Sequence, residues 1–153
     1  MTTLDKVARG GFFLVAFYTA SYFSSLKTCG APLSYRPPGP VFGGAWALIS
    51  IAVAVAWAFS SLYKEAVPQW CVDAAFVLLS ALLVSYMVVP QSCNSPVGLY
   101  LIWASFFVSL AAYTMLRWPS KAGLVPLLAW LLFAARMQGD IVCGSCGAAK
   151  GPA

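Results

Sequence analysis

The 153-residue sequence contains no histidine and few charged residues. Only 8% of its residues are Asp, Glu, Lys or Arg, nine of them basic and four acidic. Soluble domains carry about 25% charged residues, so this composition excludes an ordinary cytosolic enzyme and a disordered chain. The basic residues are scattered and form no cluster that follows phosphates, which excludes a nucleic-acid partner. Without histidine, triads and zinc or haem sites that use it are excluded as well.

Recognisable catalytic arrangements are also missing from the sequence. It has no paired carboxylates, no nucleophile beside a base and no glycine-rich phosphate loop. We therefore expect a non-enzymatic protein without catalytic residues, a resident metal or a covalent cofactor.

Long apolar runs make up most of the sequence. Hydrophobic residues make up 61% of the chain, and a helix that crosses a bilayer needs about 20 of them in a row. Because lipid forces each backbone group to pair within its own helix, the runs predict an all-α membrane protein. We expect one domain, residues 1–153, with five transmembrane helices at about 11–26, 41–63, 67–90, 97–116 and 122–142.

The loop charges predict an orientation. Five spans place the two termini on opposite sides of the bilayer. The side of the N-terminus carries five basic residues and the other side carries three. The positive-inside rule therefore places the N-terminus on the cytoplasmic side.

Four of the five cysteines fall on the side opposite the N-terminus: Cys29, Cys93, Cys143 and Cys146. If that side is oxidising, one or two disulfides form there. Unlinked thiols are an equal alternative, since free cysteine behaves as a small hydrophobe. A four-thiolate zinc site is a weaker one, to which the Cys143–Cys146 spacing would contribute half.

Charged residues inside apolar spans require an explanation. Asp73 lies in the third span, near the end of that span on the membrane side that holds the N-terminus. There we expect Lys64 or Lys121 as a partner. In the fifth span Arg136 and Asp140 stand four residues apart, so they share a helix face and can pair. The alternative is that Arg136 faces a cavity and binds an anionic ligand.

Two stretches carry a resemblance to a known family. Residues 35–48 read YRPPGPVFGGAWAL, and residues 125–134 read VPLLAWLLFA. The first resembles the TspO/MBR signature, an aromatic residue and a Pro-Pro pair before a Val-Phe and a Trp that open the second helix. The second is similar to the fifth helix of that family, the translocator or tryptophan-rich sensory proteins. The resemblance extends over essentially the whole chain.

The resemblance implies a five-helix bundle with a pocket roofed by the first loop. Members of the family bind tetrapyrroles such as protoporphyrin, and also sterols and aromatic drug-like molecules. By position, Tyr35 replaces the loop tryptophan of the family, and Pro37 and Pro38 shape the lid. Arg36 or Arg136 would meet propionates. The cavity would be lined by Trp46, Trp130, Phe133 and Ala134.

Three functions follow in order of preference. The first is a membrane binding protein that sequesters, senses or transfers a tetrapyrrole or similar hydrophobic ligand. The second is a structural subunit of a larger membrane complex, favoured because Pro40 and Ser50 replace aromatic residues common in the family. The third is light-dependent porphyrin breakdown. Small residues at Ala52, Ala56 and Ser60 also suit close helix packing, including a homodimer.

Overall fold

The computed structural model describes residues 2–23, 38–60, 67–88 and 96–148. These residues form five α-helices and one short 3₁₀ helix, and they contain no β-strand. The elements are α1 (Thr3–Phe23), α2 (Gly39–Ala58), α3 (Gln69–Val88), α4 (Val97–Met115), η1 (Ser120–Leu124) and α5 (Val125–Ala148). The chain is all-helical, as the apolar runs predict.

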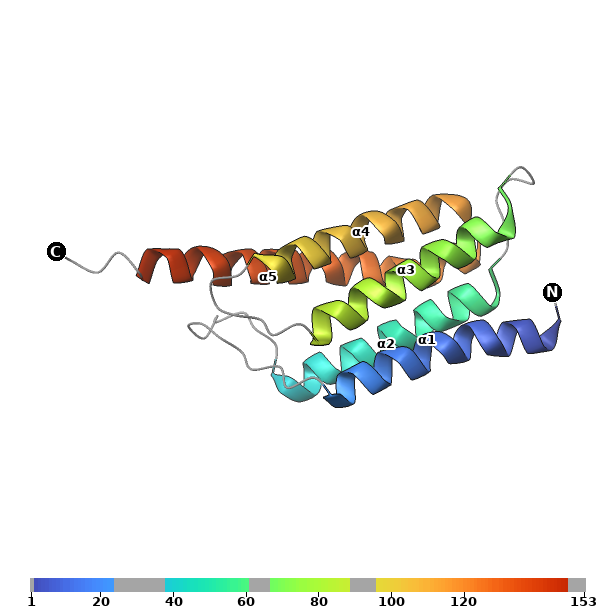
Figure 1. The fold of residues 1–153 in the computed structure, drawn as a ribbon, viewed down its shortest axis with the longest axis horizontal. Coiled ribbons are helices and arrows are strands. Elements are labelled where there is room, and N and C mark those ends of the chain that lie inside the picture. The colour runs from blue at the N-terminus through green and yellow to red at the C-terminus, as the bar shows by residue number, and fades with distance from the viewer. Residues whose placement is uncertain (1, 24–37, 61–66, 89–95, 149–153) are drawn as a thin grey trace.

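Successive helices run in opposite directions along one bundle axis, so α1 begins and α5 ends at opposite ends of the bundle (Figure 1). α1 packs on α2 and α3, α3 on α4, and α4 on α5, while η1 lies against α2. We name the two halves of the bundle after one residue each. The Asp73 half is where α1 and α3 begin, and the Trp130 half is where α1 ends and α2 begins.

Four helical stretches are long and apolar enough to cross a membrane: Pro40–Ala58, Gln69–Val88, Val97–Met115 and Ser120–Cys143. Large apolar side chains also cover the outside of the bundle; Leu48 is 72% exposed and Phe107 is 61% exposed. A helix facing water would place polar residues there. Four of the predicted spans are thus confirmed by length and composition, and the fold is compatible with a multi-pass membrane protein.

α1 is not among these four stretches, and it begins eight residues earlier than the predicted start at residue 11. The Thr2 hydroxyl accepts a hydrogen bond from the Asp5 N–H at 3.2 Å, and the Asp5 carboxylate accepts one from the Thr2 N–H at 2.8 Å. This reciprocal pair is a capping box, which starts a helix at the next residue. The prediction followed apolar residues alone and missed it.

The other boundaries differ by a few residues. α2 begins at Gly39, with Pro40 in the first turn where a missing N–H costs nothing, and ends at Ala58. α5 starts at Val125 after η1 and continues to Ala148, six residues past the predicted end at 142. Residues 24–26, 61–63 and 89–90 of the predicted spans lie outside the described residues.

Two glycines allow neighbouring elements to approach α2 closely. A Cβ atom on Gly123 of η1 would lie 2.6 Å from the Ala52 carbonyl oxygen and 2.9 Å from the Ala56 Cβ atom. A Cβ atom on Gly10 of α1 would lie 3.4 Å from the Ala54 carbonyl oxygen. Small residues on two sides of α2 therefore bring α1 and η1 against its backbone.

Candidate functional site

Five aromatic rings gather where α1, α2 and α5 meet, and we call them the aromatic cluster. The ring centroids of Trp46 and Trp130 lie 5.9 Å apart at an interplanar angle of 73°. Phe42 lies 5.3 Å and Phe133 lies 5.6 Å from Trp130, and Phe17 lies 5.3 Å from Trp46. Edge-to-face and tilted contacts of this kind are the favourable geometry for aromatic pairs.

The spacing of these residues along two helices produces the cluster. Phe42 and Trp46 are four residues apart on α2, and Trp130 and Phe133 are three apart on α5, so each pair shares a helix face. Phe17 and Trp46 are buried, while Phe42, Trp130 and Phe133 remain partly exposed. The cluster thus has two inner rings and a partly exposed outer side.

The indole N–H of Trp130 is buried, and within the described part of the chain it has no hydrogen-bond partner. Three buried serines, by contrast, are satisfied within their own helices. The hydroxyls of Ser80, Ser105 and Ser109 each donate to the carbonyl four residues earlier, at 2.7–2.8 Å. A buried donor without an acceptor costs about 1–3 kcal/mol, so Trp130 differs from the rest of the described interior.

Polar groups also lie near the cluster. The Ser50 hydroxyl is buried, donates to the Ala47 carbonyl at 2.9 Å and lies 3.3 Å from the Tyr18 hydroxyl. The Gln138 amide, one turn beyond Ala134, is also buried. No role for Tyr18 or Gln138 follows from the sequence patterns.

A second polar constellation occupies the Asp73 half. The Arg9 guanidinium donates to one Asp73 carboxylate oxygen at 2.7 Å. The other oxygen accepts from the Trp57 indole N–H at 2.9 Å and from the Gln69 amide at 3.4 Å. The Gln69 amide also lies 3.1 Å from the Ser60 hydroxyl. Asp73 therefore joins α1, α2 and α3, with Arg9 as an ion-pair partner that was not expected from the sequence. Lys64, one of the two lysines expected to meet Asp73, lies outside the described residues.

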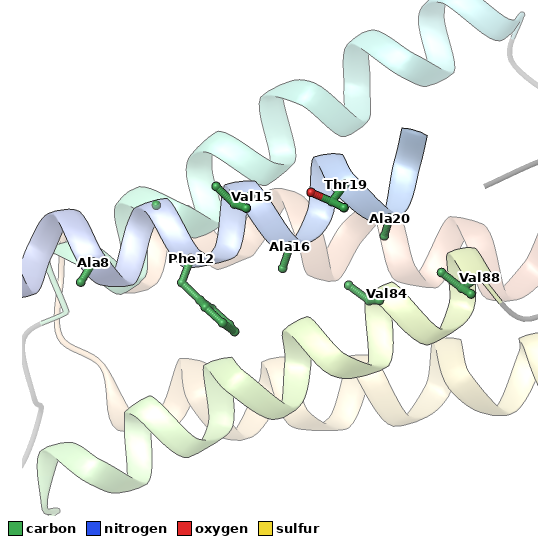
Figure 2. A pocket seen from close by; sticks show the side chains of 9 residues that line it. Ala8, Phe12, Val15, Ala16, Thr19, Ala20, Val84 and Val88 are labelled. Carbon is green, nitrogen blue, oxygen red and sulfur yellow. The ribbon is translucent and has the colours of Figure 1, made fainter. Parts of the chain in front are cut away.

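A groove of about 770 Å³ lies between α1 and α3. α1 supplies small and apolar residues with one hydroxyl, that of Thr19, and α3 supplies Val84 and Val88 (Figure 2). Val84 and Val88 point toward α1 (Figure 2). The lining offers no charge, so the groove suits hydrocarbon.

The residues predicted to bind ligand fall into three groups. The structure brings Trp46, Trp130 and Phe133 into ring contact. Ala134 is buried beside them on α5, Arg136 is exposed three residues past Phe133, and Pro38 is exposed at the start of α2. The remaining three, Tyr35, Arg36 and Pro37, lie outside the described residues.

The cysteine cluster stays a prediction. Cys143 is exposed near the end of α5 and carries a free thiol, as does Cys71 on α3. Cys29, Cys93 and the side chain of Cys146 lie outside the described residues. Among the described residues, no group of three or more Cys, Asp or Glu side chains is placed to hold a metal ion.

Comparison with known proteins gives no match: no family model matches the chain, and neither a curated protein nor a solved structure is similar to it. The class of the protein is therefore defined by its fold, an all-helical bundle with four helices able to cross a membrane. Any narrower assignment has to come from the aromatic cluster and the Asp73 constellation.

Proposed function

We propose that this chain is a non-enzymatic membrane protein that binds a planar hydrophobic ligand of the tetrapyrrole class beside the aromatic cluster. It would sequester, sense or transfer that ligand. The observation that carries the proposal is the buried indole N–H of Trp130, which has no acceptor in the described part of the chain. A ligand atom that accepts this hydrogen bond would recover the free energy lost by burying the donor.

The proposal includes five crossings of the bilayer, with the N-terminus on the cytoplasmic side. α1 has 21 residues and measures about 32 Å, which matches a hydrocarbon core of about 30 Å. It runs antiparallel to α2 within the bundle (Figure 1). α1 would supply the fifth crossing although its first turns are charged.

The ring spacing indicates where the ligand lies. A flat molecule between two rings needs about 3.5 Å on each face, or about 7 Å in all. The centroids of Trp46 and Trp130 are only 5.9 Å apart, and the rings meet edge to face. We therefore place the ligand on the outer side of the cluster, against Trp130 and Phe133. Because the Trp130 N–H is buried, binding requires a rotation of that indole, a common interface adjustment.

Arg136 supports a ligand with a negatively charged edge. It is exposed on α5 and lies about 9 Å along the helix from Trp130. An exposed arginine on a membrane helix is expensive unless it is paired, and a propionate would pair with it. A sterol, the other ligand that the resemblance implies, has a hydroxyl for Trp130 but no anion for Arg136, so we rank porphyrins first.

Titration of the purified protein with protoporphyrin tests the proposal. Binding should be saturable and quench tryptophan fluorescence. Trp130→Phe keeps a ring but removes the donor, and the loss of one hydrogen bond of about 1 kcal/mol weakens binding about fivefold. No saturable binding to the unmodified protein would reject the ligand class.

A matched control is Trp70→Phe, which removes one indole from an exposed position of α3. It lowers the fluorescence by a comparable amount but should leave the affinity unchanged. Equal affinities for Trp130→Phe and Trp70→Phe would mean that the Trp130 N–H does not contact the ligand.

The groove between α1 and α3 favours a second candidate function, an accessory subunit of a membrane complex. A transmembrane helix of a partner would bury the small residues there, among them Ala8, Gly11 and Ala16, and small residues permit close helix contact. Under this function a stoichiometric partner is retained by the unmodified protein and lost from Ala16→Leu, which fills the groove. Porphyrin binding would be absent from both.

A further inference from the structure

α1 differs from the other helices in its amino-acid composition. Three of its first seven residues, Asp5, Lys6 and Arg9, are charged. All four stretches apolar enough to cross a membrane lie in other elements of the described chain. Arg9 stands about 9 Å inside the start of the helix, so in the five-pass arrangement it enters the apolar layer. An arginine in that layer opposes insertion unless a partner neutralises it.

The bundle supplies such a partner. The Arg9 guanidinium lies 2.7 Å from an Asp73 carboxylate oxygen, with the two side chains only 16% and 32% exposed. The other carboxylate oxygen is held by Trp57 at 2.9 Å. The carboxylate is therefore oriented by a group on α2 as well as by the Arg9 charge on α1.

Packing around Arg9 complements the ion pair. Gly10 brings the backbone of α1 against Ala54 of α2, and the Phe12 ring meets the Trp57 ring edge to face at 6.0 Å. Phe13 is 1% exposed. Residues that directly follow Arg9 thus pack against α2.

We propose that α1 crosses the bilayer only as a helix docked on α2 and α3. In this arrangement the Asp73 carboxylate neutralises the Arg9 charge within the apolar layer. This inference rests on the five-pass arrangement proposed above. If α1 does not cross, four crossings remain, and the two termini then share one side of the membrane whichever way α2–α5 are oriented. The side of the N-terminus relative to the C-terminus therefore reports the state of α1.

Two single-cysteine reporters of the full-length chain measure this in sealed vesicles of one orientation, using a membrane-impermeant maleimide. One reporter is Thr3→Cys, and the other is the native Cys143 near the end of α5, each with the remaining cysteines replaced by serine. In the parent protein, only one of the two reporters should react before detergent is added. If both reporters react or neither does, the five-pass arrangement is wrong, and the five crossings have to be removed from the proposed function.

Asp73→Asn keeps the shape of the side chain but removes the carboxylate charge that lies against the Arg9 guanidinium. The fraction of molecules with both reporters on one side should rise at least about tenfold, because an arginine that has lost this neutralising charge opposes insertion at least that strongly. Arg9→Gln alone should leave the termini on opposite sides, since the charge is gone. The double variant Arg9→Gln/Asp73→Asn should restore the parental pattern.

The pattern across variants separates this inference from simple misfolding. General damage from Asp73→Asn would persist in the double variant, and that result would overturn the proposal. It would also be overturned if Asp73→Asn kept the termini on opposite sides. Lys6→Gln serves as the matched control, because Lys6 lies over the Phe59 ring at 5.1 Å instead of pairing with Asp73, and it should not change the topology.

Discussion

The two halves of the bundle treat a tryptophan in opposite ways. In the Asp73 half, the Trp57 ring stacks on Phe76 with centroids 5.3 Å apart, and its N–H donates to Asp73 at 2.9 Å. In the Trp130 half, Trp130 is surrounded by rings, and its buried N–H has no partner among the described residues. The satisfied donor stabilises the fold, whereas the unsatisfied one is the group that the proposed function assigns to a ligand.

The largest expected effect on stability comes from removing the Asp73 carboxylate, which accepts hydrogen bonds in the Asp73 half. Asp73→Ala removes the carboxylate that the Arg9 guanidinium and the Trp57 N–H both contact, so the free energy of unfolding should fall by about 3 kcal/mol. Denaturant unfolding in mixed micelles, followed by circular dichroism, measures it. A loss below about 1 kcal/mol would show that the ion pair behaves as a surface pair.

The next effect compares the two tryptophans directly. Trp57→Phe and Trp130→Phe remove the same volume, but only the first removes a hydrogen bond to a charged group. Trp57→Phe should therefore destabilise the protein by about 2 kcal/mol more than Trp130→Phe when no ligand is present. If the two variants lower the midpoint of thermal unfolding equally, the Trp57 hydrogen bond does not distinguish the stability of the two halves.

A smaller effect concerns the contact of η1 with the middle of α2. Gly123→Ala places a methyl group 2.6 Å from the Ala52 carbonyl oxygen, so η1 must shift, at a cost of about 1.5 kcal/mol. The control is Gly44→Ala, where a methyl group meets nothing within 4 Å. If the two variants unfold at the same temperature, the close approach does not stabilise the bundle.

The smallest effect sharpens the description of the Trp130 half. If Arg136 pairs with a propionate, the protein should bind protoporphyrin about fivefold more tightly than its dimethyl ester, a difference of about 1 kcal/mol. Arg136→Gln should abolish that preference while leaving the affinity for the ester unchanged. A preference that survives the substitution would assign the anion to another residue.

Much of the fold follows from the sequence because lipid makes long apolar runs into helices. The start of α4 at Val97 is as predicted. The start of α1 was wrong because the Thr2 and Asp5 cap lies outside the apolar run. The continuation of α5 from residue 142 to Ala148 was missed, because Gly139 and Asp140 lower the hydropathy of this stretch without ending the helix.

The site was less predictable, since it depends on which helices lie side by side. The structure brings Trp46 and Trp130 into ring contact, but ligand binding by these residues stays a prediction. Neither charge pattern nor spacing identified Arg9 as the partner of Asp73, because 64 residues separate them. The sequence did contain one indication: Arg9 and Asp73 are both charged residues in or beside an apolar run, and such residues usually pair with one another.

α5 projects past the other helices at the end where the chain finishes (Figure 1). Its tip lies about 35 Å from the contact of Gly123 with α2, so a tilt of about 5° around that pivot carries the tip through about 3 Å. The helix is thus a lever that magnifies small rearrangements near its base. A spin label on Cys143, far along this arm, would register movements too slight to see at the tryptophans themselves.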